Sequence, residues 1–127
     1  MLIPKSGRFG FLILFTCLAG SGAEPAFAET LFDIGQRVYE RQCSACHSLD
    51  HNRIGPRHRA VFGRRAGSLQ DYRYSDALKN AEFSWTEERL ETWLADPTEM
   101  VPGTSMGFSL GDAEERKAVI HYLKGLN

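Results

Sequence analysis

The sequence has few residues that could cross-link a fold or anchor it in a membrane. Three cysteines occur among 127 residues, which leaves no basis for a framework of several disulfides. The longest apolar run, Phe9 to Leu18, is shorter than the roughly twenty residues that a membrane-spanning helix needs. Internal repeats and low-complexity segments are also absent, so we expect a single globular domain rather than an array.

The chain also lacks a strong net charge. Its 15 lysines and arginines nearly balance 16 aspartates and glutamates, for a formal charge of −1. This balance, together with the export pattern described next, argues against binding to nucleic acid. The charges are nevertheless segregated along the chain. The basic cluster is Arg53, Arg57, Arg59, Arg64, Arg65 and Arg73, and the acidic cluster that follows is Glu82, Glu87, Glu88, Glu91, Asp96 and Glu99. The basic cluster could steer an anionic partner or hold an anionic group, or it could be a solvated loop.

The N-terminus has the three parts of a secretory signal. Lys5 and Arg8 precede the apolar run, and a small-x-small cleavage site ends at Ala28. An uncleaved membrane anchor would need a longer apolar run and a linker. The pattern therefore predicts a cleaved signal peptide over residues 1–28 and a mature domain over residues 29–127. We expect export to the periplasm without stable insertion into the membrane.

The segment Cys43-Ser44-Ala45-Cys46-His47 is the most informative motif in the sequence. Two thiols three residues apart, followed at once by a histidine, form the attachment signature of a c-type haem. This spacing places both sulfurs on the same side of one helical turn, within reach of the two vinyl groups of the porphyrin. His47 can then ligate the iron. The motif predicts one covalent haem c per chain, and an electron carrier rather than an enzyme.

Other interpretations of the two thiols are weaker. A structural zinc site commonly takes four ligands, and no second Cys/His pair follows the motif. A thioredoxin-like site needs a βαβ context, which the surrounding sequence lacks. A disulfide across three residues would be strained and would close almost no loop. Cys17 lies in the predicted signal peptide, so the porphyrin would use both remaining thiols.

The mature chain predicts an all-α fold of about four short helices joined by long loops. The expected helices cover residues 30–42, 75–80, 88–94 and a final stretch that begins at Asp112. Ser84 and Glu87 match a capping box before the third helix, and Pro97 is expected to end it. The expected buried positions are Ile34, Val38, Tyr39, Leu90, Trp93, Leu94, Val119, Tyr122, Leu123 and Leu126. Loops of this length need an object to wrap around, and a haem would provide one.

The second axial ligand decides between electron transfer and ligand-binding chemistry. A methionine would raise the reduction potential and close the iron to small molecules, whereas an open site would bind peroxide or a gas. Met100 and Met106 are the candidates in the mature chain, and the residues alone leave both open. Pro102-Gly103 favours a tight turn that could return Met106 to the haem.

Taken together, the motifs of the mature sequence resemble those of the class I cytochrome c family. The sequence is most similar to mitochondrial cytochrome c and its periplasmic bacterial relatives. The similarity extends from end to end with few or no gaps. The matching residues are Gly35, Tyr39, Cys43, Cys46, His47, Gly55-Pro56, Phe62-Gly63-Arg64, Tyr74, Trp85, Pro102-Gly103-Thr104 with Met106, and Tyr122-Leu123-Lys124. The resemblance implies the cytochrome c fold.

The resemblance also implies roles for individual residues. It favours Met106 over Met100 as the sixth iron ligand, opposite His47. It implies that the Pro56 carbonyl accepts a hydrogen bond from His47 and fixes its tautomer. The residues implied to hold the haem propionates and the far edge of the haem are Arg64, Tyr74, Trp85 and Thr104.

The implied function is a monomeric electron shuttle that docks transiently with respiratory or photosynthetic redox complexes. Its donor would be a quinol-oxidising complex or a dehydrogenase, and its acceptor an oxidase, a reductase or a reaction centre. Alternatives are a haem peroxidase or gas-binding protein, if Met106 is displaced, and a dedicated haem subunit of one dehydrogenase. A weak, small interface is expected for the shuttle.

The sequence departs from the family pattern at several positions. Leu78 replaces an asparagine that is common in the family, and Trp93 replaces a tyrosine near the methionine sulfur; both changes alter polarity around the haem. Non-lysine residues occupy several places of the basic ring found in mitochondrial members, namely Gln42, Thr98, Glu99 and Ser105. The three histidines outside the haem motif are interpreted as surface or loop residues, namely His51, His58 and His121.

Overall fold

The computed structural model describes residue 2 and residues 28–127. Almost all of the predicted signal peptide therefore lies outside the described residues. Five helices occur in the described part of the chain: α1 Leu31–Gln42, α2 Asp76–Lys79, α3 Glu87–Ala95, α4 Pro97–Met100 and α5 Ala113–Lys124. Loops connect them, and the only β-pairing among these residues is an isolated bridge between Arg65 and Ser84. The all-α prediction is confirmed. Within residues 28–127 none of the helices is both long enough and apolar enough to cross a bilayer.

α1 begins where the sequence provides a complete N-terminal cap. The Thr30 hydroxyl accepts a hydrogen bond from the Asp33 backbone N–H at 3.2 Å, and the Asp33 carboxylate accepts one from the Thr30 N–H at 3.1 Å. The reciprocal pair satisfies backbone donors that a helix start leaves unpaired. Val38 and Tyr39 are buried on the predicted apolar face, while Ile34 is partly buried. The helix then leads directly into the Cys43 motif.

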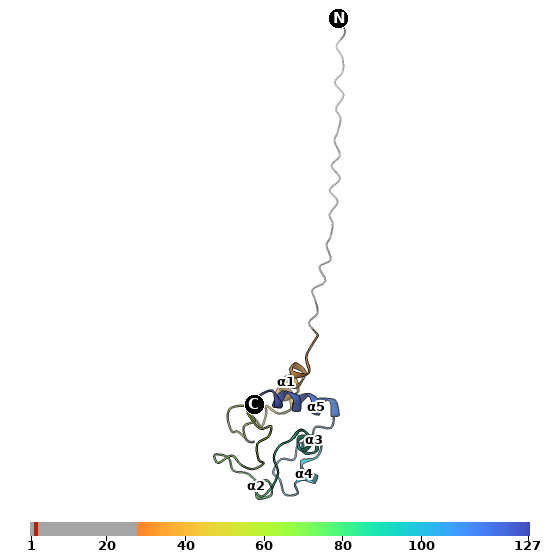
Figure 1. The fold of residues 1–127 in the computed structure, drawn as a ribbon. Helices are drawn as coiled ribbons and strands as arrows, with labels where there is room; N and C mark the ends of the chain where they lie inside the picture. The colour runs from red at the N-terminus through yellow and green to blue at the C-terminus, as the bar shows by residue number, and fades with distance from the viewer. Residues whose placement is uncertain (1, 3–27) are drawn as a thin grey trace.

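α1 and α5 form the main helix–helix contact of the domain and lie side by side in Figure 1. Gly35 faces the backbone of Ala118 and the side chain of Tyr122, so the helices approach closely at this point. Aromatic rings pack around the contact, because Tyr122 lies 4.9 Å from Phe32 and 5.6 Å from Tyr39, measured between ring centroids. The first and last helices therefore pack closely against each other.

The middle of the chain differs from the prediction in two details. The N-cap of α3 is Thr86, whose side chain accepts from the Arg89 N–H, and the predicted capping box at Ser84 is wrong. Ser84 is instead held in an extended conformation by its bridge to Arg65. Pro97 follows the end of α3 as expected, but it also begins the short helix α4, with Asp96 as N-cap. Proline suits the first helical position because its missing N–H would have had no partner there.

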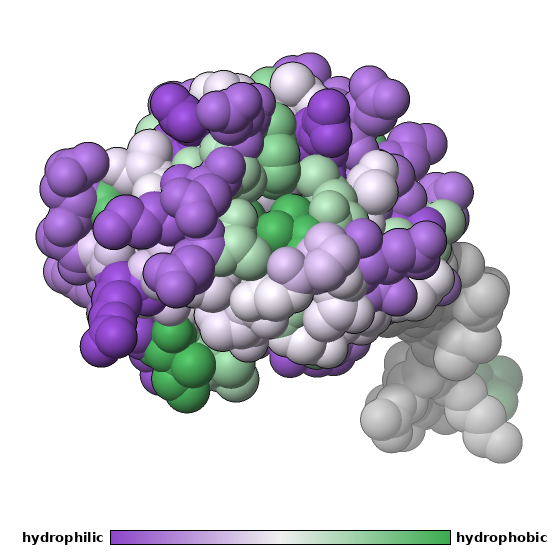
Figure 2. Space-filling view, turned by 90° about the horizontal axis from the view of Figure 1, so that it is seen from below, coloured by the Kyte–Doolittle hydropathy of each residue, from purple (hydrophilic) through white to green (hydrophobic). Residues whose placement is uncertain are grey.

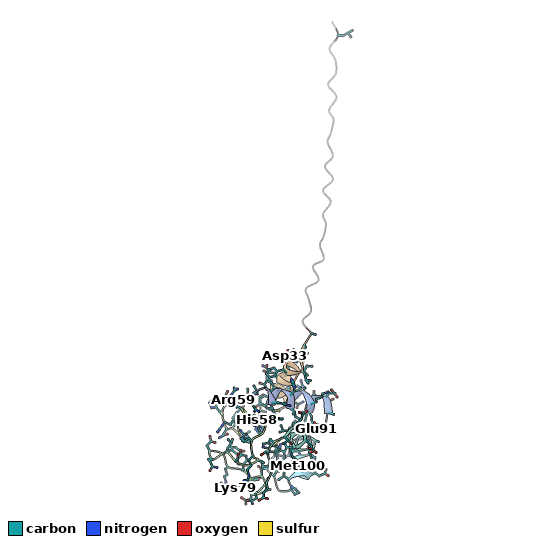
Figure 3. All side chains as sticks on the ribbon, in the orientation of Figure 1. Asp33, His58, Arg59, Lys79, Glu91 and Met100 are labelled. Atoms are coloured by element: carbon teal, nitrogen blue, oxygen red, sulfur yellow. The ribbon has the colours of Figure 1, made fainter. Side chains whose placement is uncertain are left out.

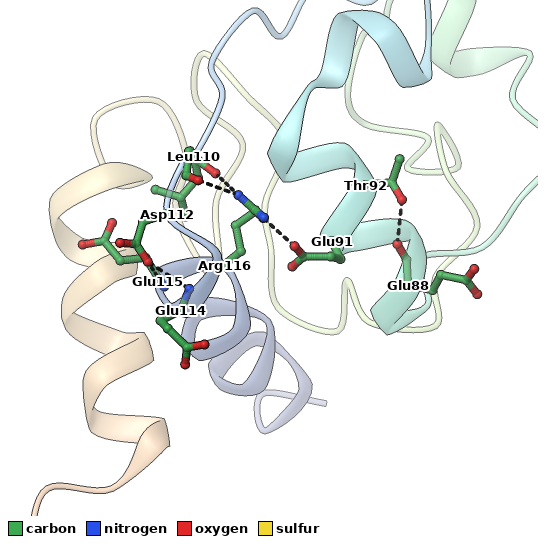
Figure 4. A network of polar contacts seen from close by, with 9 residues as sticks. Glu88, Glu91, Thr92, Leu110, Asp112, Glu114, Glu115 and Arg116 are labelled. Atoms are coloured by element: carbon green, nitrogen blue, oxygen red, sulfur yellow. Dashed lines mark hydrogen bonds and ion pairs between the residues drawn. The ribbon is translucent and has the colours of Figure 1, made fainter.

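The long loop before α5 is tied down by a network around Arg116 (Figure 4). The Arg116 guanidinium donates to the Glu91 carboxylate of α3 at 2.6 Å, and to the carbonyls of Leu110 and Gly111 at 2.8 and 2.9 Å. Its side chain is 13% exposed. Asp112 accepts from two backbone N–H groups and caps α5 at the predicted start. The end of the loop is thereby fixed against two helices.

We expect Arg116→Leu to lower the free energy of unfolding of the holoprotein by about 1–3 kcal/mol, because it leaves sheltered hydrogen-bond acceptors without their donor. Denaturation in guanidinium chloride measures this loss. Arg37→Leu is the matched control, since it breaks the exposed ion pair with Glu29 and should cost less than about 1 kcal/mol. Equal losses in the two variants would contradict a special role of the Arg116 network.

Candidate functional site

The two thiols lie on one turn of backbone at the end of α1. The Cys43 N–H donates to the Tyr39 carbonyl at 2.8 Å, and the N–H groups of Cys46 and His47 donate to the Cys43 carbonyl at 3.1 and 2.9 Å. Neither thiol is in a disulfide. Cys43 is partly buried and Cys46 is exposed. The turn predicted from the i, i+3 spacing is therefore present, with one sulfur deeper than the other.

Burial is the largest influence on the Cys43 thiol. It raises the pKa of Cys43 to about 11, and the neighbouring Cys46 acts in the same direction. The Cys43 side chain is thus an uncharged thiol at neutral pH.

His47 is buried and held by a specific hydrogen bond. The residue is 9% exposed, and its Nδ1 lies 2.8 Å from the carbonyl oxygen of Pro56. With Nδ1–H donating to Pro56, the lone pair of Nε2 is available to a metal. Burial lowers the pKa of His47, although the Pro56 hydrogen bond opposes this shift. The neutral imidazole that iron ligation requires is therefore the favoured form at neutral pH.

Gly55 allows the histidine to occupy this position. A Cβ atom added at Gly55 would overlap with the His47 ring. We expect Gly55→Ala to push the ring away from Pro56, to lower stability by about 1–2 kcal/mol and to perturb the Soret and visible absorption of the holoprotein. Gly111→Ala is the control, because a Cβ there meets no atom within 4 Å. Unchanged spectra and stability in Gly55→Ala would contradict this close contact.

The residues predicted for the site converge on one cavity of about 440 Å³. Those that line it are Cys43, Cys46, His47, Pro56, Arg64, Tyr74, Trp85, Thr104 and Met106. They come from the end of α1 and from three separate loops. Met100 does not line the cavity, and its partly buried side chain packs against the core at the end of α4 (Figure 3). Of the two methionines that the residues alone left open, only Met106 faces this space.

The rest of the cavity wall is mainly apolar. Buried aliphatic side chains from the loops, α2, α3 and α5 contribute to it, namely Val61, Leu78, Leu90, Leu94, Val119 and Leu123. Trp93 lies against Trp85, with ring centroids 5.1 Å apart in an edge-to-face arrangement. In Figure 2, hydrophobic residues gather near the centre of the face, with hydrophilic residues on both sides of them. The cavity has the size and apolar lining typical of cofactor sites. Two thiols, an imidazole and a thioether in such a space fit an iron porphyrin.

Arg64 places a positive charge at this cavity. Its guanidinium donates to the carbonyls of Arg57 and Arg59, at 2.9 and 3.3 Å, and no ion pair of the described residues includes it. Burial lowers the pKa of Arg64, so the charge is held at a cost in solvation. Burial also raises the pKa of Tyr74, which keeps its hydroxyl protonated as a donor. Both groups are suited to an anionic group in the cavity.

The Met106 loop makes the predicted turn. Gly103 has φ +89°, a conformation that L side chains rarely adopt, and the Thr104 N–H donates to the Val101 carbonyl at 3.0 Å. The Thr104 hydroxyl accepts from the Met106 N–H at 3.4 Å. The turn brings the partly buried Met106 side chain to the cavity wall.

Two cavity residues were missed or misplaced by sequence reasoning. His58 lies in a loop, as expected, but its partly buried ring lines the cavity and stacks on His47. A histidine between two arginines gives no local signal of burial. The expectation of surface positions holds for His51 and His121, both of which are exposed. Tyr72 also lines the cavity, and its hydroxyl donates to the Ile54 carbonyl at 2.6 Å.

Comparison with known proteins agrees with this geometry. The family model described as cytochrome c matches residues 32–127. The chain is 36% identical over 124 residues to cytochrome c2 of Blastochloris viridis, covering 94% of this chain and 91% of that protein. It is 46% identical over 97 residues to cytochrome c2 of Afifella marina, covering 71% and 77%. Among solved structures, cytochrome cH from Methylobacterium extorquens superposes with a TM-score of 0.69 at 37% identity, over 72% of this chain and 95% of that one.

These relatives favour electron transfer over the peroxidase, gas-binding and dehydrogenase-subunit alternatives. They also agree with the all-α structure and with the haem motif at the end of α1. The chain therefore belongs to the cytochrome c family of mono-haem electron carriers, with one covalently attached haem c.

Proposed function

We propose that the haem of this carrier is attached through Cys43 and Cys46, and that His47 and Met106 are its axial ligands. The observation that carries the proposal is that one cavity is lined by both thiols, the buried imidazole and the thioether. The Pro56 hydrogen bond supports Nε2 of His47 as the ligating atom. The distance of Met100 along the chain from the Thr104 turn, and its absence from the cavity wall, support Met106.

The same cavity offers partners for the two haem carboxylates. We assign Arg64, Tyr74 and Trp85 to the propionates and Thr104 to the far edge of the haem. Arg64 is a partly buried cation, and Tyr74 provides a protonated hydroxyl. Trp85, a residue that is 7% exposed, provides an indole N–H. A carboxylate away from water needs such donors, since an unpaired buried charge is costly.

When bound, the haem supplies a one-electron iron couple. The chain's own residues hold the axial side chains in place during both oxidation states. Pro56 and Gly55 fix the His47 ring, and the turn at Gly103 fixes the approach of Met106. The apolar wall excludes water and so favours the less charged ferrous form. Little rearrangement then accompanies the gain or loss of an electron.

We further propose that the carrier works as a monomer in the periplasm, after cleavage behind Ala28. Its partners are redox complexes of a respiratory or photosynthetic chain, as the relatives named cytochrome c2 and cytochrome c suggest. Two exposed apolar residues, Ile54 and Phe108, lie at the cavity and could make short-lived contacts. They are 77% and 41% exposed. A small interface of this kind suits fast dissociation.

Expression of the full chain in a bacterium that matures c-type haems tests both proposals. We expect a red protein in the osmotic-shock fraction, with the mass of residues 29–127 plus one haem. Quinol-supplied membranes should reduce it, and a terminal oxidase should reoxidise it. Ala28→Asp is the control, because it should block cleavage and shift the protein to the membrane fraction. A cytoplasmic protein, or one that membranes cannot reduce, would contradict the proposals.

A further inference from the structure

His58 is a partly buried histidine that the proposed function does not use. Its ring stacks on the His47 ring, with centroids 4.0 Å apart and planes inclined by 21°. A second aromatic neighbour is Tyr39, whose ring meets it edge-on with centroids 5.6 Å apart. The Nδ1 atom of His58 is buried and has no hydrogen-bond partner among the described residues. A polar ring in this position, without a polar contact at Nδ1, needs another explanation.

The backbone holds His58 in place from both sides. Its N–H donates to the Ser48 carbonyl at 3.0 Å, and its carbonyl accepts from the Val61 N–H at 2.9 Å. The segment is therefore tied directly to the haem-motif turn, since Ser48 follows His47 in the sequence. The backbone hydrogen bond to Ser48 therefore places the His58 ring near His47.

The flanking arginines pin the same segment from outside. Arg57 donates to Asp71 at 2.5 Å, and Arg59 pairs with Asp50 through two hydrogen bonds. These two side chains are therefore engaged with carboxylates at the surface, while the residue between them faces the cavity. With its backbone bonded and both neighbours anchored, the His58 ring has little freedom to leave the His47 face.

The Pro56 hydrogen bond leaves one motion of His47 uncontrolled. A single bond from Nδ1 fixes where that atom points, but the ring can still rotate about the axis through the bond. A flat ring stacked on the imidazole opposes this rotation, because turning either plane would force the two rings together. Stacking geometry and hydrogen bonding therefore constrain different movements of the same side chain.

We propose that His58 is a positioning residue for the axial imidazole, setting the plane of the His47 ring by face-to-face contact. The inference rests on the proposed role of His47 as an iron ligand. It concerns the flat shape of the His58 side chain, and it assigns no proton transfer to it. The orientation of an axial ligand plane governs how unpaired spin spreads over a ferric haem, so the consequence is visible spectroscopically.

Two variants separate the effect of a flat side chain at position 58 from the effect of its ring nitrogens. His58→Phe keeps a flat ring without ring nitrogens, and His58→Leu removes the flat ring. Paramagnetic proton NMR of the ferric holoprotein reports the ligand plane through the spread of the haem methyl shifts and the shifts of the His47 ring protons. We expect the leucine variant to change this pattern and the phenylalanine variant to restore it. His51→Leu and His121→Leu, at exposed positions, are controls that should leave it unchanged.

A leucine variant with lower stability but the wild-type shift pattern would overturn the proposal, because His58 would then be a simple packing residue. A phenylalanine variant as altered as the leucine variant would also overturn it, since nitrogen rather than flatness would matter. Failure of the underlying ligand assignment looks different. In that case the wild-type protein itself would lack shifted His47 ring protons.

Discussion

We expect the replacement of Met106 by alanine to lower the reduction potential by on the order of a few tenths of a volt and to remove the sulfur-to-iron charge-transfer band. Axial ligands set haem potentials over a range of about 0.8 V, and a thioether favours the ferrous form. Without Met106, water or a harder donor would occupy the sixth position and stabilise ferric iron. A spectroscopic redox titration of wild type and variant measures the potential and the band together.

Met100→Ala is the matched control for this experiment. Met100 is partly buried at the end of α4 and does not face the cavity, so its loss should leave the potential and the band close to wild type. Truncating its side chain still removes core contacts, so some stability would be lost. If Met100→Ala abolished the band and Met106→Ala did not, the ligand assignment would be reversed.

Gly35→Ala is expected to cause the largest loss of stability among single methyl additions in this chain. A Cβ at Gly35 would lie 2.7 Å from Tyr122 Cβ and 2.8 Å from the Ala118 carbonyl carbon. These are backbone and near-backbone atoms, so α1 and α5 would have to separate. Alanine normally gains about 1 kcal/mol over glycine in a helix, but overpacking of this kind exceeds that gain. We expect a net loss of about 3 kcal/mol in guanidinium denaturation of the holoprotein.

Gly111→Ala again provides the control, since nothing lies within 4 Å of the added atom and the backbone there is not left-handed. It should change the free energy of unfolding by less than about 0.5 kcal/mol. A Gly35→Ala variant as stable as this control would mean that α1 and α5 do not cross closely at Gly35. The packing of α1 against α5 would then need a different description.

Local patterns predicted the parts of the site that are close in sequence. The thiol pair and His47 follow from spacing alone, because one helical turn dictates their geometry. The expected helix starts near Thr30, Ser75 and Asp112 were likewise close to the observed ones, and each of these residues is an N-cap in the structure. The cap at Thr86 was missed because a long-range bridge, not a local preference, governs Ser84.

Distant relationships could not be obtained from local patterns. The turn signal at Pro102-Gly103 was not enough to decide between Met100 and Met106, since both follow the third predicted helix in loop-like sequence. The family resemblance favoured Met106, and the cavity lining agrees. His58 shows the same limit more clearly. Its burial depends on bonds to Ser48 and Val61 and on a ring contact across the haem-motif loop. Such contacts exist only once the chain has folded.

The most direct test of the account is a tryptic digest of the purified, unfolded protein. The resulting peptides are separated by chromatography under denaturing, acidic conditions. Cleavage after Arg41 and Arg53 releases one peptide that contains both thiols of the motif, Gln42–Arg53. We predict that all haem absorbance elutes with this peptide, whose mass exceeds that of its sequence by one haem. Recovery of the bare peptide, with the pigment free in solution, would contradict attachment through Cys43 and Cys46.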